Sequence, residues 1–135
     1  MICAVHALVG AVVGRVVDSR PGAFAAGVAT HLLGDLLPHK DFEPKIEAPL
    51  LAATLGLIAW RCGVNSPEFI GALGGVAPDV ENAARAVGLI PSESMRFPTH
   101  AGDGRMHGPK TASALPQGIG AALCAAYLLS TSPRD

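Results

Sequence analysis

Residues 30–41 read Thr-His-Leu-Leu-Gly-Asp-Leu-Leu-Pro-His-Lys-Asp, and this stretch marks where an apolar helix is predicted to end. His31 and Asp35 are four residues apart and therefore share one helical face. Pro38 disfavours further helix, which places His39 and Asp41 in the turn that follows. Imidazole and carboxylate groups in an apolar setting are costly unless they are paired, protonated or bound to metal. A metal site is therefore the first hypothesis to weigh.

The composition indicates one small domain of closely packed helices. Of the 135 residues, 50% are hydrophobic, only 16% are charged, and 4% are aromatic. Charged residues make up about a quarter of an ordinary soluble domain. The length fits a single domain over residues 1–135, and 16 glycines favour helices that approach closely. A formal net charge of −1 argues against nucleic-acid binding by phosphate neutralisation.

The cysteines and the first residues of the chain indicate the cellular compartment in which the protein is expected. Cys3, Cys62 and Cys124 are odd in number and far apart. They are predicted to be free thiols in a reducing compartment, and no disulfide frame or zinc knuckle is expected. The apolar start lacks a basic segment and is interrupted by Arg15 and Asp18. We therefore expect a protein that is not secreted.

Hydrophobic residues recur at helical spacing along the chain, and no segment alternates as a strand would. A long loop is expected at 88–110, where loops of this length are often functional, and a frayed tail at 130–135. The sequence thus predicts an all-α fold, a compact bundle of about five helices. The expected helices are 2–17, 23–37, 46–62, one that begins at Ser66-Pro67 and is interrupted by Gly74-Gly75, a short one from Pro78 to about 87, and 115–129.

Two of these segments raise the question of a membrane. Residues 112–129 form an uncharged segment whose length is at the lower limit for a membrane-spanning helix. Pro116 lies inside this segment, however, so its helical part could be shorter. Residues 48–60 are also uncharged but shorter. We expect membrane association to be slightly favoured, so the predicted location is the bacterial inner membrane or the cytoplasm.

The first two predicted helices carry matching stripes of small and polar residues. His6 and Gly10 lie one turn apart on the first helix, and Gly27, His31 and Asp35 lie one turn apart on the second. If these stripes face each other, the backbones approach closely and His6 can meet His31 and Asp35. The alternative is a satisfied core pair in which His31 donates to Asp35. The expected convergence with His6 favours metal.

Two further groups carry chemistry. Asp79 and Glu81 follow a glycine-rich segment and could bind an ion. Alternatively, Asp79 could cap the start of a helix and Glu81 could stabilise its first turn. In the long loop, His100 and His107 flank Arg105. Their imidazoles could bind zinc, manganese or iron, and the guanidinium could pair with a phosphate. Loop histidines are otherwise usually solvated.

The order of these motifs resembles a known family. The pattern is H-x-x-x-G from residue 6, H-x-x-x-D-x-x-P-H from 31, G-x-x-P-D-x-E from 75, and a late histidine pair. It is similar to small bacterial inner-membrane-associated metal-dependent hydrolases and, more distantly, to zinc-dependent phospholipase C and related single-strand nucleases. That family has a compact late His-Arg-Gly-x-x-His-Ser, whereas here His100 and His107 are seven apart and Gly108 replaces the serine.

The resemblance implies a helical metal site and a hydrolase activity. One or two divalent ions, zinc first with manganese or iron as alternatives, would activate water against a phosphoester or phosphodiester of a lipid or nucleotide. Asp79 or Glu81 would accept the proton from water, and Arg105 would neutralise the phosphate. The implied metal ligands are His6, His31, Asp35, Asp79 and His107, with His39 and His100 as further candidates.

Alternatives from other classes remain open at this point. A non-catalytic metal-binding or structural membrane-associated protein could use the same residues in a closed site. A metal-free interaction domain could pair them with one another. No serine, cysteine or threonine stands out beside a histidine, so covalent catalysis is not expected. Beyond Pro38, His39 and Asp41 rank second and could simply face water.

Overall fold

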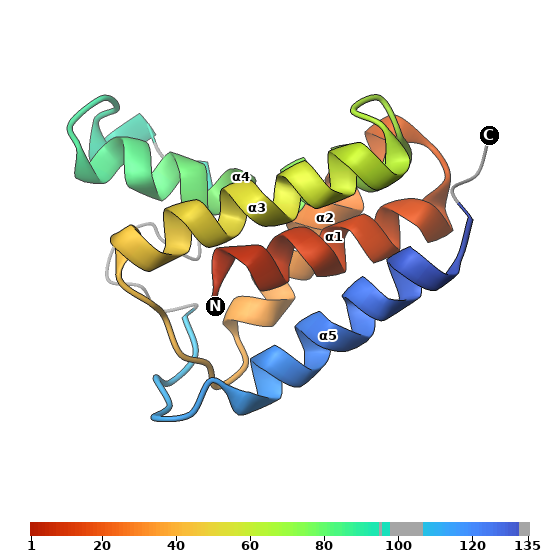
Figure 1. Ribbon diagram of the computed structural model, residues 1–135. Coiled ribbons are helices and arrows are strands. Elements are labelled where there is room, and N and C mark those ends of the chain that lie inside the picture. Colours follow the sequence, from red (N-terminus) through yellow and green to blue (C-terminus); the bar gives the residue numbers. More distant parts are fainter. Residues whose placement is uncertain (95, 98–106, 133–135) are drawn as a thin grey trace.

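The computed structural model describes residues 1–94, 96–97 and 107–132. Five α-helices account for most of this part, which confirms the predicted all-α bundle (Figure 1). A 3₁₀ turn, η1, covers Ser92–Ser94. The helices are α1 (Cys3–Val17), α2 (Arg20–Asp35), α3 (Pro44–Cys62), α4 (Pro67–Ala86) and α5 (Leu115–Ser130).

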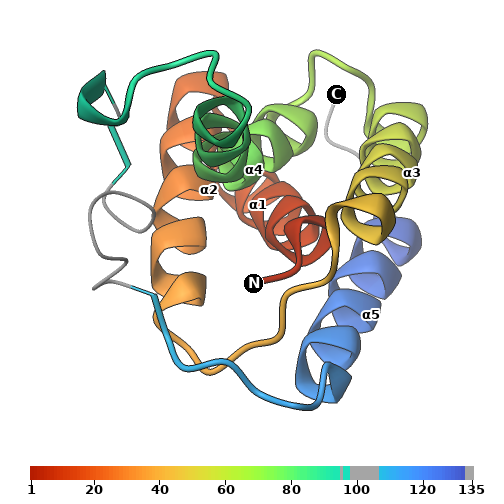
Figure 2. The same ribbon diagram turned by 90° about the vertical axis from the view of Figure 1, so that its left-hand side faces the viewer.

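The helices form an inner group and an outer pair. α1, α2 and α4 pack most extensively against one another. Viewed from the side, α3 and α5 lie together on the other side of α1, away from α2 (Figure 2). The central cluster of buried apolar side chains joins both groups and includes Ala7, Ala11, Ile58, Ala72 and Leu128.

The starts of two helices, one different from the prediction and one in agreement with it, have local reasons. α2 begins at Arg20 rather than at residue 23, because Pro21 in the first turn has no N–H that a helix would need to bond. α4 begins as predicted, with the Ser66 hydroxyl accepting from the Phe69 N–H at 3.0 Å.

The predicted break at Gly74-Gly75 was wrong, because α4 runs without interruption from Pro67 to Ala86. Pro78 lies inside this helix, so the predicted separate short helix is its last part. A Cβ on Gly74 would collide with the Phe24 carbonyl of α2, and one on Gly75 with the His6 carbonyl of α1. The glycines are therefore required by close packing, which outweighs their low helix propensity.

The small-residue stripes of α1 and α2 were predicted to face each other, but both face α4. A Cβ on Gly10 or on Gly27 would collide with the Gly71 carbonyl, and a Cβ on Gly71 would collide with the Gly10 carbonyl. The three backbones are thus in contact around Gly71. This contact holds the middle of α1 and the middle of α2 against the second turn of α4.

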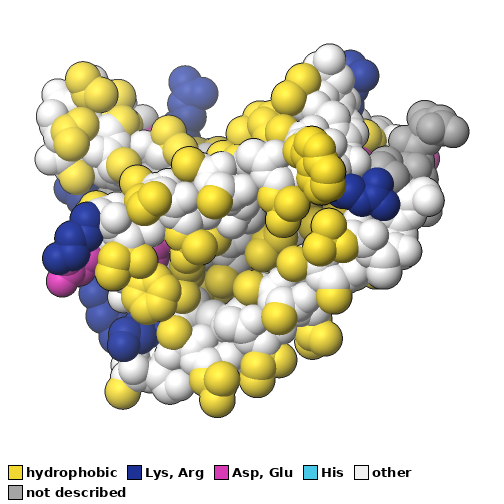
Figure 3. All heavy atoms as spheres, in the orientation of Figure 1, with side chains coloured by type: hydrophobic (Ala, Val, Ile, Leu, Met, Phe, Trp, Pro, Cys, Tyr) yellow, Lys and Arg dark blue, Asp and Glu magenta, His cyan; other side chains and the backbone are white. Residues whose placement is uncertain are grey.

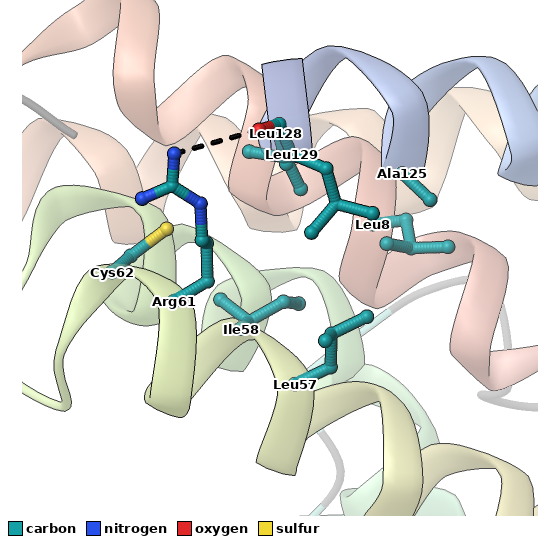
Figure 4. Close-up of a pocket in the computed structure, with 8 residues that line it drawn as sticks. All are labelled: Leu8, Leu57, Ile58, Arg61, Cys62, Ala125, Leu128 and Leu129. Atoms are coloured by element: carbon teal, nitrogen blue, oxygen red, sulfur yellow. Dashed lines mark hydrogen bonds between the residues drawn. The ribbon is translucent and has the colours of Figure 1, made fainter. Parts of the chain in front are cut away.

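The far end of α1 contains a buried ion pair. Arg15 is 3% exposed, and its Nε donates to Glu68 Oε1 of α4 at 2.8 Å. Its other nitrogens contact Thr131 and the sulfur of Cys62, and its guanidinium lies 5.7 Å from the Tyr127 ring centroid. Nearby, Leu8, Ile58 and Leu128 line a small apolar cavity that Arg61 closes by donating to the Leu129 carbonyl (Figure 4).

The outer helices expose much apolar surface. Among the 19 residues of α3, only Ile58 is buried, while Trp60 is 78% exposed and Leu123 of α5 is 68% exposed. Yellow apolar side chains cover this face, and charged groups lie toward its edges (Figure 3). Among the described residues, none of the helices combines the length and apolar character needed to cross a bilayer.

Candidate metal centre

Side chains from three helices and two connecting segments converge where α1 begins and α2 ends. Buried His6 lies on α1, buried His31 and Asp35 on α2, and Asp79 on α4. The two remaining side chains are His39, in the segment after α2, and His107, in the segment before α5. Together they form two groups with metal-ligand chemistry, His6–His31–Asp79 and Asp35–His39–His107, and within each group the ligand atoms lie within 4.8 Å of one another.

The first group lies between α1, α2 and α4. The His6 and His31 rings stack with their centroids 3.8 Å apart and an interplanar angle of 23°. His31 Nε2 lies 3.9 Å from Asp79 Oδ1. The glycine contact around Gly71 explains this convergence, because it brings these three backbones together.

The second group joins the end of α2 to the segment before α5. His39 Nε2 lies 3.2 Å from His107 Nε2. The two segments are held together by backbone bonds, since the His39 N–H donates to the Pro109 carbonyl at 3.2 Å and the Gly108 N–H donates to the Asp35 carbonyl at 2.5 Å.

Gly108, where the resembled family has serine, is explained by this packing. A Cβ at this position would collide with the carbonyl oxygens of Leu36 and Leu37. Glycine therefore allows the chain to cross the end of α2 and bring His107 against Asp35. Glycine at position 108 is therefore a requirement of close approach.

Asp35, a member of the second group, is fully buried and lies on the side that faces the first group. Its Oδ1 is 3.0 Å from His6 Nε2, and its Oδ2 is 3.2 Å from His31 Nε2 and 3.9 Å from His107 Nε2. The α-amino group of Met1 also donates to Oδ1 at 2.7 Å. One carboxylate thus contacts histidines of both groups, which is the position of a bridging ligand.

Backbone carbonyls orient the histidines. His31 Nδ1 contacts the Gly75 carbonyl at 2.7 Å, and His39 Nδ1 contacts the Leu37 carbonyl at 2.7 Å. A carbonyl can only accept, so Nδ1 of each ring donates a proton to it, and the bond turns Nε2 toward the cluster. Histidines that bind metal are commonly held in this way by a second-shell acceptor.

Several pKa values are shifted within the cluster. Burial alone would raise the pKa of Asp35, but contacts with His31 and His6 outweigh it and hold that pKa far below its usual range. Burial lowers the pKa of His6, against the opposing effect of Asp35, and burial also lowers the pKa of His107. Low pKa values favour the deprotonated forms, which are the forms that bind metal.

The donor set fits a divalent transition ion. Ligand atoms on one tetrahedral zinc lie about 3.3 Å apart, because Zn–N bonds are about 2.0–2.1 Å. The His39–His107 and His31–Asp35 atom pairs, at 3.2 Å each, match that spacing. Imidazole with carboxylate suits zinc, manganese or iron. A bound cation would also balance the negative charge of Asp35, Asp79 and Asp41 around the cluster.

His39 was ranked second as a metal ligand in the sequence-based hypothesis, with the alternative that it faces water, and the structure excludes that alternative. Its side chain is 0% exposed and belongs to the second group. Asp41, which was set aside with it, has Oδ1 3.3 Å from His39 Nε2 and Oδ2 3.5 Å from the Lys110 ammonium. The alternation of His39 and Asp41 after Pro38 was the available signal, and it was outweighed by the expectation that loop residues are solvated.

Three of the other predicted residues lie away from the cluster or outside the described part. The Glu81 carboxylate accepts from the backbone N–H groups of Arg96 and Phe97 at 2.8 and 3.0 Å. It holds that segment, and neither group of potential ligands includes it. His100 and Arg105 fall outside the described residues.

A cavity of about 640 Å³ opens beside the cluster, lined in part by Asp79, His107, Asp41 and Lys110. Cys3 also lines it, and burial, with Asp79 close by, raises the pKa of that thiol far above its usual range. The cavity and Lys110 were not predicted, because residues 79 and 110 are far apart in the sequence. The sequence matches no protein-family model and no curated protein, and no solved structure matches it.

Proposed function

We propose that this protein is a metal-dependent hydrolase that acts on phosphoesters through water activated by one or two divalent ions. The observation that carries the proposal is the position of the Asp35 carboxylate. It belongs to the second group, with His39 and His107, and it also contacts His31 of the first group. A bound divalent ion lowers the pKa of its water and polarises a phosphoryl oxygen.

The burial of each residue and its position relative to the cavity suggest its role in the reaction. Buried His6, His31, His39 and Asp35 are the structural ligands, since no solvent reaches them appreciably. Asp79, 17% exposed, and Asp41, 35% exposed, border the cavity and are placed to accept a proton from water. This assigns to Asp79 and Asp41 the role that Asp79 or Glu81 had in the sequence-based hypothesis.

The cavity supports catalysis over a closed structural site. A structural metal site fills every coordination position with protein, whereas a catalytic site keeps one open toward solvent. Asp79 and His107 line the cavity, so one side of the cluster is accessible. The thiol of Cys3 lies on the cavity wall, and its raised pKa argues against covalent catalysis by this cysteine.

Metal content is the first test. We expect untagged protein to retain at least one equivalent of zinc, manganese or iron, measured by elemental analysis after dialysis. Asp35→Asn should lose it, while Glu43→Gln, a matched carboxylate-to-amide change at an exposed residue, should keep it. Less than about a tenth of an equivalent after reconstitution would contradict the metal site.

Hydrolysis is the second test. A panel of phosphomonoesters and phosphodiesters should be turned over by metal-loaded protein, and a chelator or His31→Ala should remove that activity. Turnover that survives both treatments would contradict the mechanism. Full metal occupancy without turnover of any ester would instead favour the non-catalytic alternative.

The apolar face of α3 and α5 supports a location at a membrane surface. Glu47 is turned inward, where it accepts from the backbone N–H groups of Cys3 and Phe42, so the outward face of α3 carries no charge between Lys45 and Arg61. Trp60 and Tyr127 lie at the last turns of α3 and α5, and interfacial aromatic residues favour such positions.

Vesicle flotation tests this location. We expect the protein to float with phosphatidylcholine–phosphatidylglycerol vesicles, and Trp60→Glu or Leu123→Glu to reduce the bound fraction at least fivefold. Leu33→Glu replaces a leucine of α2 that is 65% exposed, and should change nothing. Wild-type protein that stays unbound to these vesicles would contradict membrane association and leave the metal site unaffected.

A further inference from the structure

One face of α4 leads away from the candidate metal centre and becomes apolar as it does so. Asp79, Ala83 and Ala86 recur at helical spacing and, with Val87 after the helix end, line the same cavity. At a rise of 1.5 Å per residue, Ala86 lies about 10 Å along the helix from Asp79. Val87 at the far end is 71% exposed.

The segment that enters α3 also lines this cavity. Phe42 and Pro44 belong to it, so the cavity has hydrocarbon from two separate segments of the chain. Two polar side chains on the wall accept hydrogen bonds from the protein: Glu47 accepts from two backbone N–H groups, and Asn82 Oδ1 accepts from Arg85 at 3.3 Å. A nucleobase placed here would lose hydrogen bonds that water supplies, whereas an alkyl chain would lose none.

A cation lies at the end of the cavity near the cluster. Lys110 is 78% exposed, and its Nζ is 3.5 Å from Asp41 Oδ2, which in turn lies beside His39. Backbone pairing between residues 39 and 110 fixes this position. An ammonium that is largely exposed and paired with the carboxylate beside His39 is suited to contact a phosphate oxygen.

We propose that the cavity binds a phosphoester whose alcohol part is an alkyl chain. Lys110 contacts the phosphate, and the hydrocarbon lies against Ala83, Ala86 and Val87 of one segment and Phe42 and Pro44 of the other. This inference rests on the proposed function, since it places the phosphate at the metal cluster. It assigns the alkyl class and makes nucleotides the poorer ligands of the same site.

Calorimetric titration of the zinc-loaded full chain tests it. The ligands are inorganic phosphate, methyl, butyl and hexyl phosphate, and adenosine monophosphate. We expect affinity to rise about threefold for each added methylene, below the roughly fourfold gain of complete burial. Adenosine monophosphate should bind no better than methyl phosphate.

Two variants separate the parts of the site. Ala86→Trp should fill the apolar end and abolish the gain from methyl to hexyl phosphate, with inorganic phosphate unchanged. Ala29→Trp, at an exposed alanine of α2, should keep the full gain. Lys110→Met should weaken inorganic, methyl and hexyl phosphate by the same factor, about fivefold.

The outcomes distinguish this inference from the function on which it rests. Equal affinity for methyl and hexyl phosphate, or a chain-length gain that survives Ala86→Trp, would overturn the inference while phosphate binding upheld the proposed function. Zinc uptake without binding of any phosphate would overturn both the inference and the catalytic proposal. Failure to take up zinc would overturn the metal site, and the inference with it.

Discussion

The two ends of α1 each bury charged or polar side chains, and they do so by opposite means. At the far end, Arg15 meets Glu68 at 2.8 Å, so each charge has its opposite within the protein. At the near end, His6 meets Asp35, and around them lie three further imidazoles and the carboxylate of Asp79. The far end pairs one cation with one anion, whereas at the near end a single ammonium, that of Met1, contacts a larger group of imidazoles and carboxylates that could hold a metal ion.

The difference shows what burial of polar groups indicates. A buried ion pair offsets its desolvation internally and calls for no ligand. A cluster of imidazole nitrogens and carboxylates, with Nδ1 of His31 and His39 directed at carbonyls, is organised around a positive charge. Burial alone therefore does not identify the site, whereas the chemical type of the gathered groups does.

Gly71 joins the two ends, and its substitution should have the largest effect. Gly71→Ala would drive a methyl group into the backbone of α1 at Gly10 and Gly14. We expect a loss of more than about 4 kcal/mol in the free energy of unfolding, measured in urea, together with loss of metal binding. Gly56→Ala, at an exposed helical glycine with no neighbour within 4 Å, should stabilise by about 0.5–1 kcal/mol.

Breaking the ion-pair end should cost stability but leave metal binding intact. Glu68→Leu leaves the Arg15 guanidinium buried without its carboxylate, so we expect a loss of about 3–5 kcal/mol in urea unfolding of the chelated protein. The double variant Arg15→Met, Glu68→Leu should recover most of that loss. A weakened zinc affinity in the folded double variant would show that the two ends are not independent.

Changing the cluster end should reduce metal binding above all. Asp35→Asn removes the carboxylate between the two groups, so zinc affinity should fall at least about a hundredfold, beyond the effect of a second-shell change. The chelated protein should also become less stable, because the Met1 ammonium and the neighbouring histidines lose the buried carboxylate that they contact. At 100 times its dissociation constant, zinc should stabilise the wild type by about 2.7 kcal/mol, and the same zinc concentration should stabilise the variant by no more than about 0.4 kcal/mol.

The smallest expected effect is a pH dependence confined to the cluster end. The pKa of His6 is lowered from 6.5 in the folded protein, so the unfolded chain takes up the proton first as the pH falls. The free energy of unfolding of chelated protein should therefore decrease as pH drops from about 7 through 6.5 and below, by at most about 1.4 kcal/mol per pH unit for this group.

Variants at both ends locate that dependence. Replacing His6 by Asn should reduce the slope of the pH profile in this range, because one of the two histidines with a lowered pKa, His6 and His107, is gone. The double variant Arg15→Met, Glu68→Leu should retain the wild-type slope. A profile that is steep in both variants would place the titration elsewhere.

Much of the site could be predicted from local sequence patterns, and the predictions that failed have a common cause. The stacking of His31 and Asp35 on one helical face follows from a separation of four residues, and it was predicted. The break at Gly74-Gly75 was predicted wrongly, because low helix propensity is a local property and the contact with α1 and α2 that overrides it is not. His39 was ranked too low for the same reason, since its burial depends on pairing with residues 109–111.

The sequence by itself determined the all-α class, the start and approximate length of most helices, and the identity of most metal-ligand candidates, because these follow from spacings within one helical turn. The tertiary structure alone decided that both glycine stripes face α4, that Asp35 lies between two groups of ligands, and that Lys110 and Ala86 border one cavity. The physical reason is that such contacts depend on the approach of backbones distant in the chain, which periodicity does not encode.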